Sequence, residues 1–274
     1  MGLVIFKISI LLYIVSSAVY ILYVFLQKKA MHRIAHTLLW LGFCNHTLFI
    51  VSDYAELGQM PVQTLHGTLS IFAWAIAFIF LVFHIRFKLM VLGAFVGPLI
   101  TFLSIVSYAL PGKPATVSPL FKSLWLTVHI ITSFVGNAAF AIACVVGILY
   151  LIQEGEIKEK RQGFFYRRLP SLKLLDSMGY ACIIVGFPML TAGILTGSIY
   201  SQLVWGRYWS WDPKEVWSGI TWILYAILLH ERLTVGWQGR RAAVMSILGF
   251  SVLLFTFFGV NFLLKGHHAV FTKW

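Results

Sequence analysis

The feature that most constrains this chain is a series of apolar runs that recurs along its length. Each is long enough to form a helix across the hydrocarbon of a bilayer, which is about 30 Å thick and needs about 20 residues. Within lipid every backbone N–H and C=O must be bonded internally, so helices are the default. The sequence therefore predicts an all-α polytopic membrane protein with about eight transmembrane helices. The expected helices cover roughly residues 3–26, 34–52, 65–83, 89–109, 124–152, 177–199, 213–232 and 242–263.

Composition agrees with a membrane protein. Hydrophobic residues make up 59% of the chain and charged residues only 11%, with a mean hydropathy of +0.86. A soluble domain of this composition would lack polar residues to cover its surface. Because apolar runs continue to the end, a cleaved signal peptide before a soluble domain is not expected. We expect a single integral membrane domain over residues 1–274.

The basic residues indicate the orientation of the chain. The net charge is +12, yet lysine and arginine lie in short loops between apolar runs, so no nucleic-acid partner is expected. One set of alternate loops carries fourteen of these cations and the other set carries six. The positive-inside rule then places the more basic loops in the cytoplasm and both termini outside. We expect a multi-pass protein of the cell inner membrane, and the short start favours a bacterial membrane over a thylakoid.

The three cysteines give no sign of a redox site. Cys44, Cys144 and Cys182 each lie in an apolar run, and no two form C-x-x-C. A disulfide framework or a thiol relay on this chain is therefore not expected.

The stretch WGRYWSWDPKEVW, residues 205–217, contains a helix start. Asp212 suits the N-cap, Pro213 the first helical position and Glu215 the third. This arrangement is a capping box, which predicts a helix from residue 213 without any ligand.

The rings of the same stretch need a further explanation. Five aromatic residues lie within thirteen positions: Trp205, Tyr208, Trp209, Trp211 and Trp217. One alternative is an aromatic belt at headgroup depth. A belt is spread around a protein, however, whereas a cluster on one connection builds a flat apolar surface that suits a flat apolar ligand. Gly206 would let such a ligand approach the backbone closely.

The nine histidines fall into groups by position. His32 and His84 belong with basic loops and are expected to face solvent or headgroups. His46 lies deeper, and a helix–helix hydrogen bond accounts for it. His66 starts a helix, where capping or an interfacial role competes with a ligand role.

Three histidines are expected on the outer side, with the tryptophans. His129 lies near the outer end of its helix, and His267 and His268 follow the last helix. Two imidazoles beside an aromatic surface can supply both axial nitrogens of a haem iron. Zinc is the competing metal, but the outer loops offer few carboxylates to complete a tetrahedral site. The pattern therefore favours haem.

His230 suggests a second position for haem. It lies 17 residues after Pro213, about 25 Å further along a helix, and so near the inner side. An ionisable residue at that depth is a functional candidate. Snorkelling is an equal alternative, because Glu231 and Arg232 follow directly.

The stretch at 205–217 resembles the WWD signature of haem-handling membrane proteins. The segments TWILYAILLHERL and GVNFLLKGHH are similar to the CcsA/ResC family of cytochrome c biogenesis proteins, which belongs to system II. The resemblance covers roughly residues 60–270 and is most specific at 124–137 and 205–268.

The resemblance implies particular site residues. His129 in LWLTVHIITSF matches the first external histidine of the family, His268 the second, and His230 a membrane histidine; these three are the implied iron ligands. His267 stays open as an alternative to His268. The residues implied to contact haem within the signature are Trp205, Gly206, Trp209, Trp211, Asp212 and Trp217. Residues 200–217 are then an external haem-binding segment, and no catalytic residue is implied.

The implied function is delivery of haem b across the cytoplasmic membrane and its presentation to apocytochrome c for thioether attachment. The implied partners are a CcsB/ResB-type membrane subunit, apocytochrome c with its C-x-x-C-H segment, thiol-reducing proteins and membrane lipid. The chain would be a subunit of a cytochrome c haem lyase, and whether it is an enzyme alone stays open. Three alternatives remain: a haem transporter or chaperone without an attachment role, a HemX-like regulatory protein, and a scaffold whose tryptophans form a lipid belt.

Overall fold

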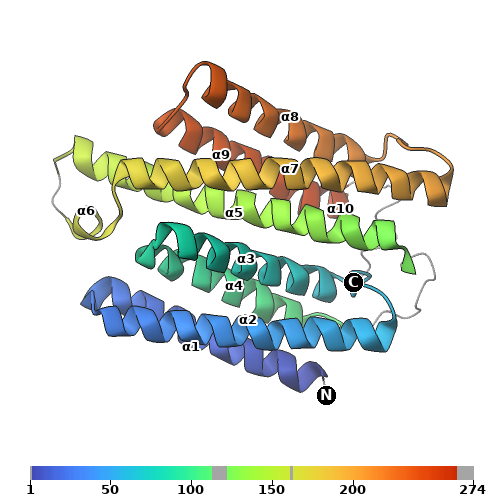
Figure 1. Ribbon diagram of the computed structural model, residues 1–274, viewed down its shortest axis with the longest axis horizontal. Helices are drawn as coiled ribbons and strands as arrows, with labels where there is room; N and C mark the ends of the chain where they lie inside the picture. The colour runs from blue at the N-terminus through green and yellow to red at the C-terminus, as the bar shows by residue number, and fades with distance from the viewer. Residues whose placement is uncertain (1, 113–121, 161–162, 264–274) are drawn as a thin grey trace. The chain divides into compact units, whose positions relative to one another are not determined.

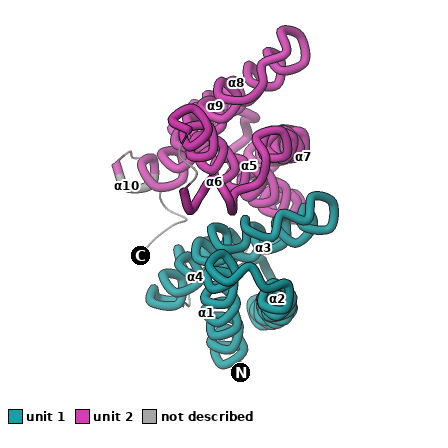
Figure 2. The backbone as a smooth tube through the Cα atoms, turned by 90° about the vertical axis from the view of Figure 1, so that its left-hand side faces the viewer, with its two compact units in different colours: residues 1–122, 274 teal, residues 123–273 magenta. Residues whose placement is uncertain are grey.

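The computed structural model describes residues 2–112, 122–160 and 163–263, and these residues are helical apart from short connections. They form two compact units, residues 1–122 and residues 123–273 (Figure 2). The predicted all-α membrane fold is therefore confirmed. A single integral membrane domain over residues 1–274 stays a prediction, since the chain packs as two units.

The described residues of unit 1 form four long helices and one short 3-10 helix between α3 and α4 (Figure 1). Glycines let its helices approach closely: a Cβ added to Gly42 would lie 2.8 Å from the Tyr13 ring, and one added to Gly97 would lie 2.9 Å from Ser17 Oγ. Ser17 also hydrogen-bonds Thr101 at 2.9 Å. Small residues and polar side chains thus hold the unit together, as is usual within membranes. The elements are α1 (Gly2–Leu26), α2 (Lys29–Leu57), α3 (Leu65–Phe87), η1 (Met90–Leu92) and α4 (Gly93–Ala109).

Unit 2 is built on two long helices, α5 and α7, which lie side by side (Figure 1). Their contact is close because it is lined by glycine: a Cβ added to Gly136 of α5 would lie 3.0 Å from the backbone nitrogen of Leu190. The elements are α5 (Leu124–Lys158), α6 (Phe164–Arg168), α7 (Leu172–Trp205), α8 (Pro213–Thr234), α9 (Arg240–Leu254), the π-helical turn η3 (Phe255–Gly259) and α10 (Val260–Leu263).

Each predicted helix has a counterpart, and the bounds differ at both ends. The ends of three helices lie five or six residues after the predicted ones: Leu57 of α2, Lys158 of α5 and Trp205 of α7. α2 begins at Lys29 and α7 at Leu172, each five residues before its predicted start. Among the described residues, seven helices are long and apolar enough to cross a membrane, and α8 is not one of them. A count of about eight spans and the outside position of both termini stay predictions.

Candidate functional site

The loop between α7 and α8 begins with a glycine turn. Gly206 caps α7 with φ +71°, and its N–H donates to the carbonyl of Gln202 at 3.1 Å. A Cβ added here would meet nothing within 4 Å, so the left-handed backbone is what requires glycine. Ser201 Oγ donates to the carbonyl of Arg207 at 2.8 Å and ties the loop back to α7.

The capping box at the start of α8 is present as predicted. Asp212 is buried, with 4% of its surface exposed, and its Oδ1 accepts from the Lys214 N–H at 2.9 Å. Glu215 accepts three bonds: from the Asp212 N–H at 3.2 Å, the Ser210 N–H at 2.7 Å and Ser210 Oγ at 3.0 Å. These bonds fix residues 210–212 against the first turn of α8. Contact between Asp212 and a cofactor stays a prediction.

The predicted aromatic cluster divides into two sets. Trp211 is 77% exposed and Trp209 36% exposed, and their rings meet edge to face at 6.1 Å. Trp217 is instead half-buried, with its ring 4.5 Å from that of Phe255. Trp205 is also half-buried, and the centre of its ring lies 6.3 Å from that of Tyr200. The loop therefore presents the exposed Tyr208 and one exposed tryptophan pair, while Trp205 and Trp217 pack within unit 2.

Trp211 has an unusual backbone conformation. Its φ is +58°, in the left-handed region that bulky residues rarely adopt. This backbone conformation destabilises the folded state by on the order of 1–3 kcal/mol and persists only where the surrounding structure imposes it. The bonds at Ser210 and Asp212, on either side of Trp211, supply that constraint.

His129 lies in the interface of α5 and α7. It is half-buried, and its Nδ1 donates to the carbonyl of Gly193 at 2.7 Å. Gly193 is twelve residues before Trp205, a distance of about 18 Å along α7. His129 thus lies well below the end of α7, deeper than the exposed tryptophan pair of the loop.

Trp217 lies closer to the level of His129. Trp222 Nε1 donates to Thr191 Oγ1 at 2.9 Å and sets α8 beside α7. Because the two helices run in opposite directions, Trp217 lies about 5 Å along the axis from the level of Gly193. Along the helix axes, Trp217 therefore lies within about one turn of Gly193, the residue that His129 bonds. His267 and His268 lie outside the described residues.

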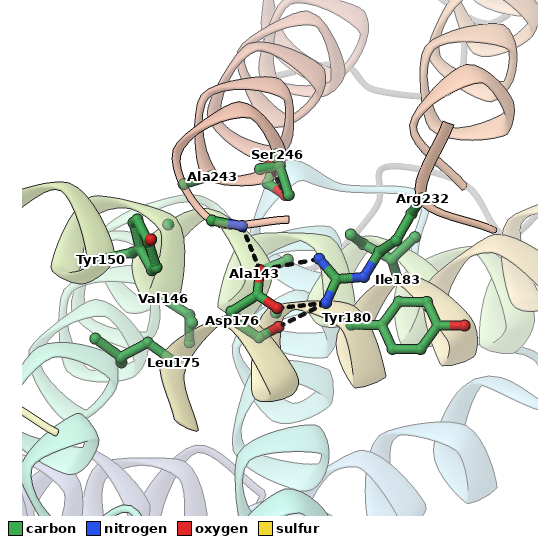
Figure 3. A pocket seen from close by; sticks show the side chains of 14 residues that line it. Ala143, Val146, Tyr150, Leu175, Asp176, Tyr180, Ile183, Arg232, Ala243 and Ser246 are labelled. Carbon is green, nitrogen blue, oxygen red and sulfur yellow. Dashed lines mark hydrogen bonds and ion pairs between the residues drawn. The ribbon is translucent and has the colours of Figure 1, made fainter. Parts of the chain in front are cut away.

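His230 is exposed on α8 near the opposite end of unit 2. Two residues further along α8, Arg232 forms a two-pronged ion pair with Asp176, with Nη1–Oδ1 3.0 Å and Nη2–Oδ2 2.6 Å (Figure 3). The Gly239 N–H donates to Asp176 Oδ1 at 2.7 Å, and the Tyr180 ring lies 4.4 Å from the guanidinium. These residues border a cavity of about 20 Å³, room for one water.

This ion pair was not predicted from the sequence. Arg232 was considered only as a cation at the end of the seventh predicted helix, and residue 176 was placed just outside the sixth. The sequence does contain a signal for it: Asp176 lies next to an apolar run, and a carboxylate in that position seldom remains unpaired.

The prediction that His32 faces solvent or headgroups was wrong. His32 is 6% exposed, and its ring lies 5.0 Å from that of His84 and 5.8 Å from that of His36. The reason is the early start of α2, which makes His32 helical and turns it toward α1 and α3. Within the described ranges, no group of three or more His, Cys, Asp or Glu is arranged to hold a metal ion.

The other histidines of unit 1 have structural partners. His46 hydrogen-bonds the Tyr13 hydroxyl at 3.3 Å and Ser70 Oγ at 2.8 Å, which confirms the predicted helix–helix bond. His66 is buried, and its Nδ1 donates to the carbonyl of Ser107 at 2.8 Å. Both imidazoles therefore join helices within unit 1.

Comparison with known proteins assigns the family. A family model described as cytochrome C assembly protein matches residues 3–268. The chain belongs to this family. The match covers both units and confirms the resemblance seen in the sequence.

Curated relatives and one solved structure support the assignment. The chain is 34% identical to the cytochrome c biogenesis protein CcsA of Chlamydomonas reinhardtii over 229 residues, which are 81% of the chain and 64% of that relative. It is 34% identical to CcsA of Guillardia theta over 242 residues, 81% of the chain and 80% of the relative. The cytochrome c haem lyase CcmF shares the fold, with a TM-score of 0.64 and 18% identity over 99% of the chain. The chain spans 49% of that lyase.

Proposed function

We propose that this family member carries haem b to the outer side of the cytoplasmic membrane and presents it to apocytochrome c for covalent attachment. The observation that carries the proposal is in unit 2. His129 is fixed by a bond from its Nδ1, Trp217 lies near the same level, and the connection above presents the exposed pair Trp209 and Trp211. An imidazole beside flat apolar rings suits haem.

The roles of the residues follow from their chemistry. His129 and His268 supply the two axial nitrogens, each as a neutral imidazole. Trp209 and Trp211 cover the exposed face or edge of the ring. Trp205, Gly206 and Asp212 hold the connection in shape, and Trp217 lies near the level of His129 along the helix axes. This chain supplies no nucleophile, and its contribution is position.

Attachment uses groups that apocytochrome c brings. The histidine of its C-x-x-C-H segment displaces one axial ligand. Each thiol then adds across a haem vinyl group, with sulfur bonding one carbon and the thiol proton reaching the other. No net oxidant or reductant is consumed, but the thiols must be reduced, which is the task of thiol-reducing partner proteins.

His230 would receive haem on the inner side. It lies at the end of unit 2 opposite the Trp-bearing loop and is exposed, so a second ligand from a CcsB/ResB-type subunit could reach it. The chain is then one subunit of a haem lyase. In this orientation the Trp-rich segment, residues 200–217, faces outward.

Visible spectra of the purified protein, alone and with a CcsB/ResB-type subunit, test the proposal. We expect a Soret band that His129→Ala and His268→Ala weaken and His267→Ala does not. If His230→Ala were the only variant to lose haem, the inner position would be the main haem site. A protein without haem in every preparation, partner included, would overturn the proposal.

A further inference from the structure

The α7 surface beneath His129 consists of two glycines one turn apart. Gly193 and Gly197 belong to the segment G-I-L-T-G. A Cβ added to Gly197 would lie 2.7 Å from His129 Nδ1 and 2.8 Å from its Cε1, and one added to Gly193 would overlap Ser133 Oγ. The imidazole therefore rests directly on the backbone of α7, at a place where a methyl group does not fit.

The bond to Gly193 determines which ring nitrogen carries the proton. A carbonyl oxygen only accepts, so the 2.7 Å bond requires the proton on Nδ1 of His129. In a neutral imidazole the lone pair then belongs to Nε2. Thr196 Oγ1 donates to the Ala192 carbonyl at 2.7 Å and lies 3.1 Å from the Gly193 carbonyl, which is part of the helical backbone of α7.

We propose that Gly193 and Gly197 position His129 as an iron ligand. The Gly193 carbonyl holds the proton on Nδ1 so that Nε2 can bind iron, and Gly197 leaves the space that the ring needs. Histidines that bind metals usually donate their second N–H to a carbonyl or carboxylate, which sets the tautomer and the ring orientation. The inference rests on the proposed function, in which His129 is an axial ligand. Neither glycine touches haem; both act through His129.

A purely structural role is the competing explanation, because small residues four apart commonly let membrane helices pack closely. The test therefore needs a readout that packing alone does not change. Gly197→Ala is the informative variant, since its new methyl group meets the His129 ring. Gly179→Ala is the matched control on the same helix, where the nearest atom to an added Cβ is Val146 Cγ1 at 3.8 Å.

The first measurement uses haem bound to the full-length protein. For Gly197→Ala we expect about 10- to 100-fold weaker haem affinity, the usual cost of losing a partner that orients a ligand. We also expect a visible spectrum and a reduction potential like those of His129→Ala, with added imidazole restoring the six-coordinate spectrum in both variants. Gly179→Ala should match the unsubstituted protein in all three readouts, and all variants should elute alike on gel filtration.

The second measurement does not depend on haem. Ring-nitrogen NMR of histidine-labelled protein should show the Nδ1–H tautomer of His129, and Gly197→Ala should alter that signal. An Nε2–H tautomer in the unsubstituted protein would overturn the inference. A haem spectrum that responds to His129→Ala but not to Gly197→Ala would overturn the positioning role alone. If His129→Ala left the haem spectrum unchanged, both the proposed function and the positioning role would be overturned.

Discussion

The two ends of unit 2 are stabilised in opposite ways. At the Trp-bearing end, Asp212 and Glu215 bond to groups two to five positions away in the chain and leave Trp211 exposed. At the other end, Asp176 of α7 binds Arg232, 56 residues away, and Gly239, 63 residues away. The first end is built to shape a loop locally, and the second to hold separate helices in register.

The largest expected effect concerns the long-range end. Asp176→Ala leaves the guanidinium of Arg232, only 8% exposed, without its carboxylate partner. Breaking a pair as shielded as this one costs about 3–5 kcal/mol, so thermal unfolding in detergent should occur at clearly lower temperature.

Two further variants sharpen that result. Glu154→Gln should change stability by about 0–1 kcal/mol, because its partners Lys158 and Arg240 are 60% and 65% exposed. The double variant Asp176→Leu with Arg232→Leu should recover much of the loss, because no unpaired charge remains. Equal destabilisation by Glu154→Gln and Asp176→Ala would contradict the distinction between the ends.

Trp217→Leu tests the packed ring. It removes the contact with Phe255. We expect the free energy of unfolding to fall by about 1–2 kcal/mol, within the usual range for point substitutions. Trp209→Leu replaces a more exposed ring. It should change the free energy of unfolding by less than about 0.5 kcal/mol and should lower haem occupancy. The comparison fails if Trp209→Leu destabilises the protein as much as Trp217→Leu does.

Asp212→Ala removes the helix cap. The free energy of unfolding should fall by about 1 kcal/mol, because the Lys214 N–H loses its acceptor. Hydrogen exchange should rise at residues 210–216 and stay unchanged near Asp176. A uniform rise over both ends would show that the cap also acts at long range.

The smallest effect has the opposite sign. Trp211→Gly relieves the left-handed backbone and should stabilise the protein by up to about 1 kcal/mol relative to Trp211→Ala. Both variants should lose haem alike. Stability measured by chemical unfolding separates the backbone effect from the ring, and equal stability of the two variants would show that Trp211 is not strained.

Local signals in the sequence were predictive, and long-range pairs were not. Asp212, Pro213 and Glu215 are neighbours, so their cap could be derived from residue types alone. The bond between His129 and Gly193 joins residues 64 apart, and no pattern within one helix indicates it. The start of α2 was missed because Lys28 makes no side-chain cap there. The five-residue α6 is too short to show a helical period.

Helix length has a final consequence for the tryptophan pair. α7 has 34 residues and is about 50 Å long, whereas the hydrocarbon of a bilayer is about 30 Å thick. With the predicted span 177–199 in the lipid, residues 200–205 extend about 9 Å beyond it. The headgroup layer on each side is roughly 5–8 Å deep. We therefore expect Trp209 and Trp211, on the loop beyond Trp205, to stand in water, where a soluble polypeptide can reach them without entering the bilayer.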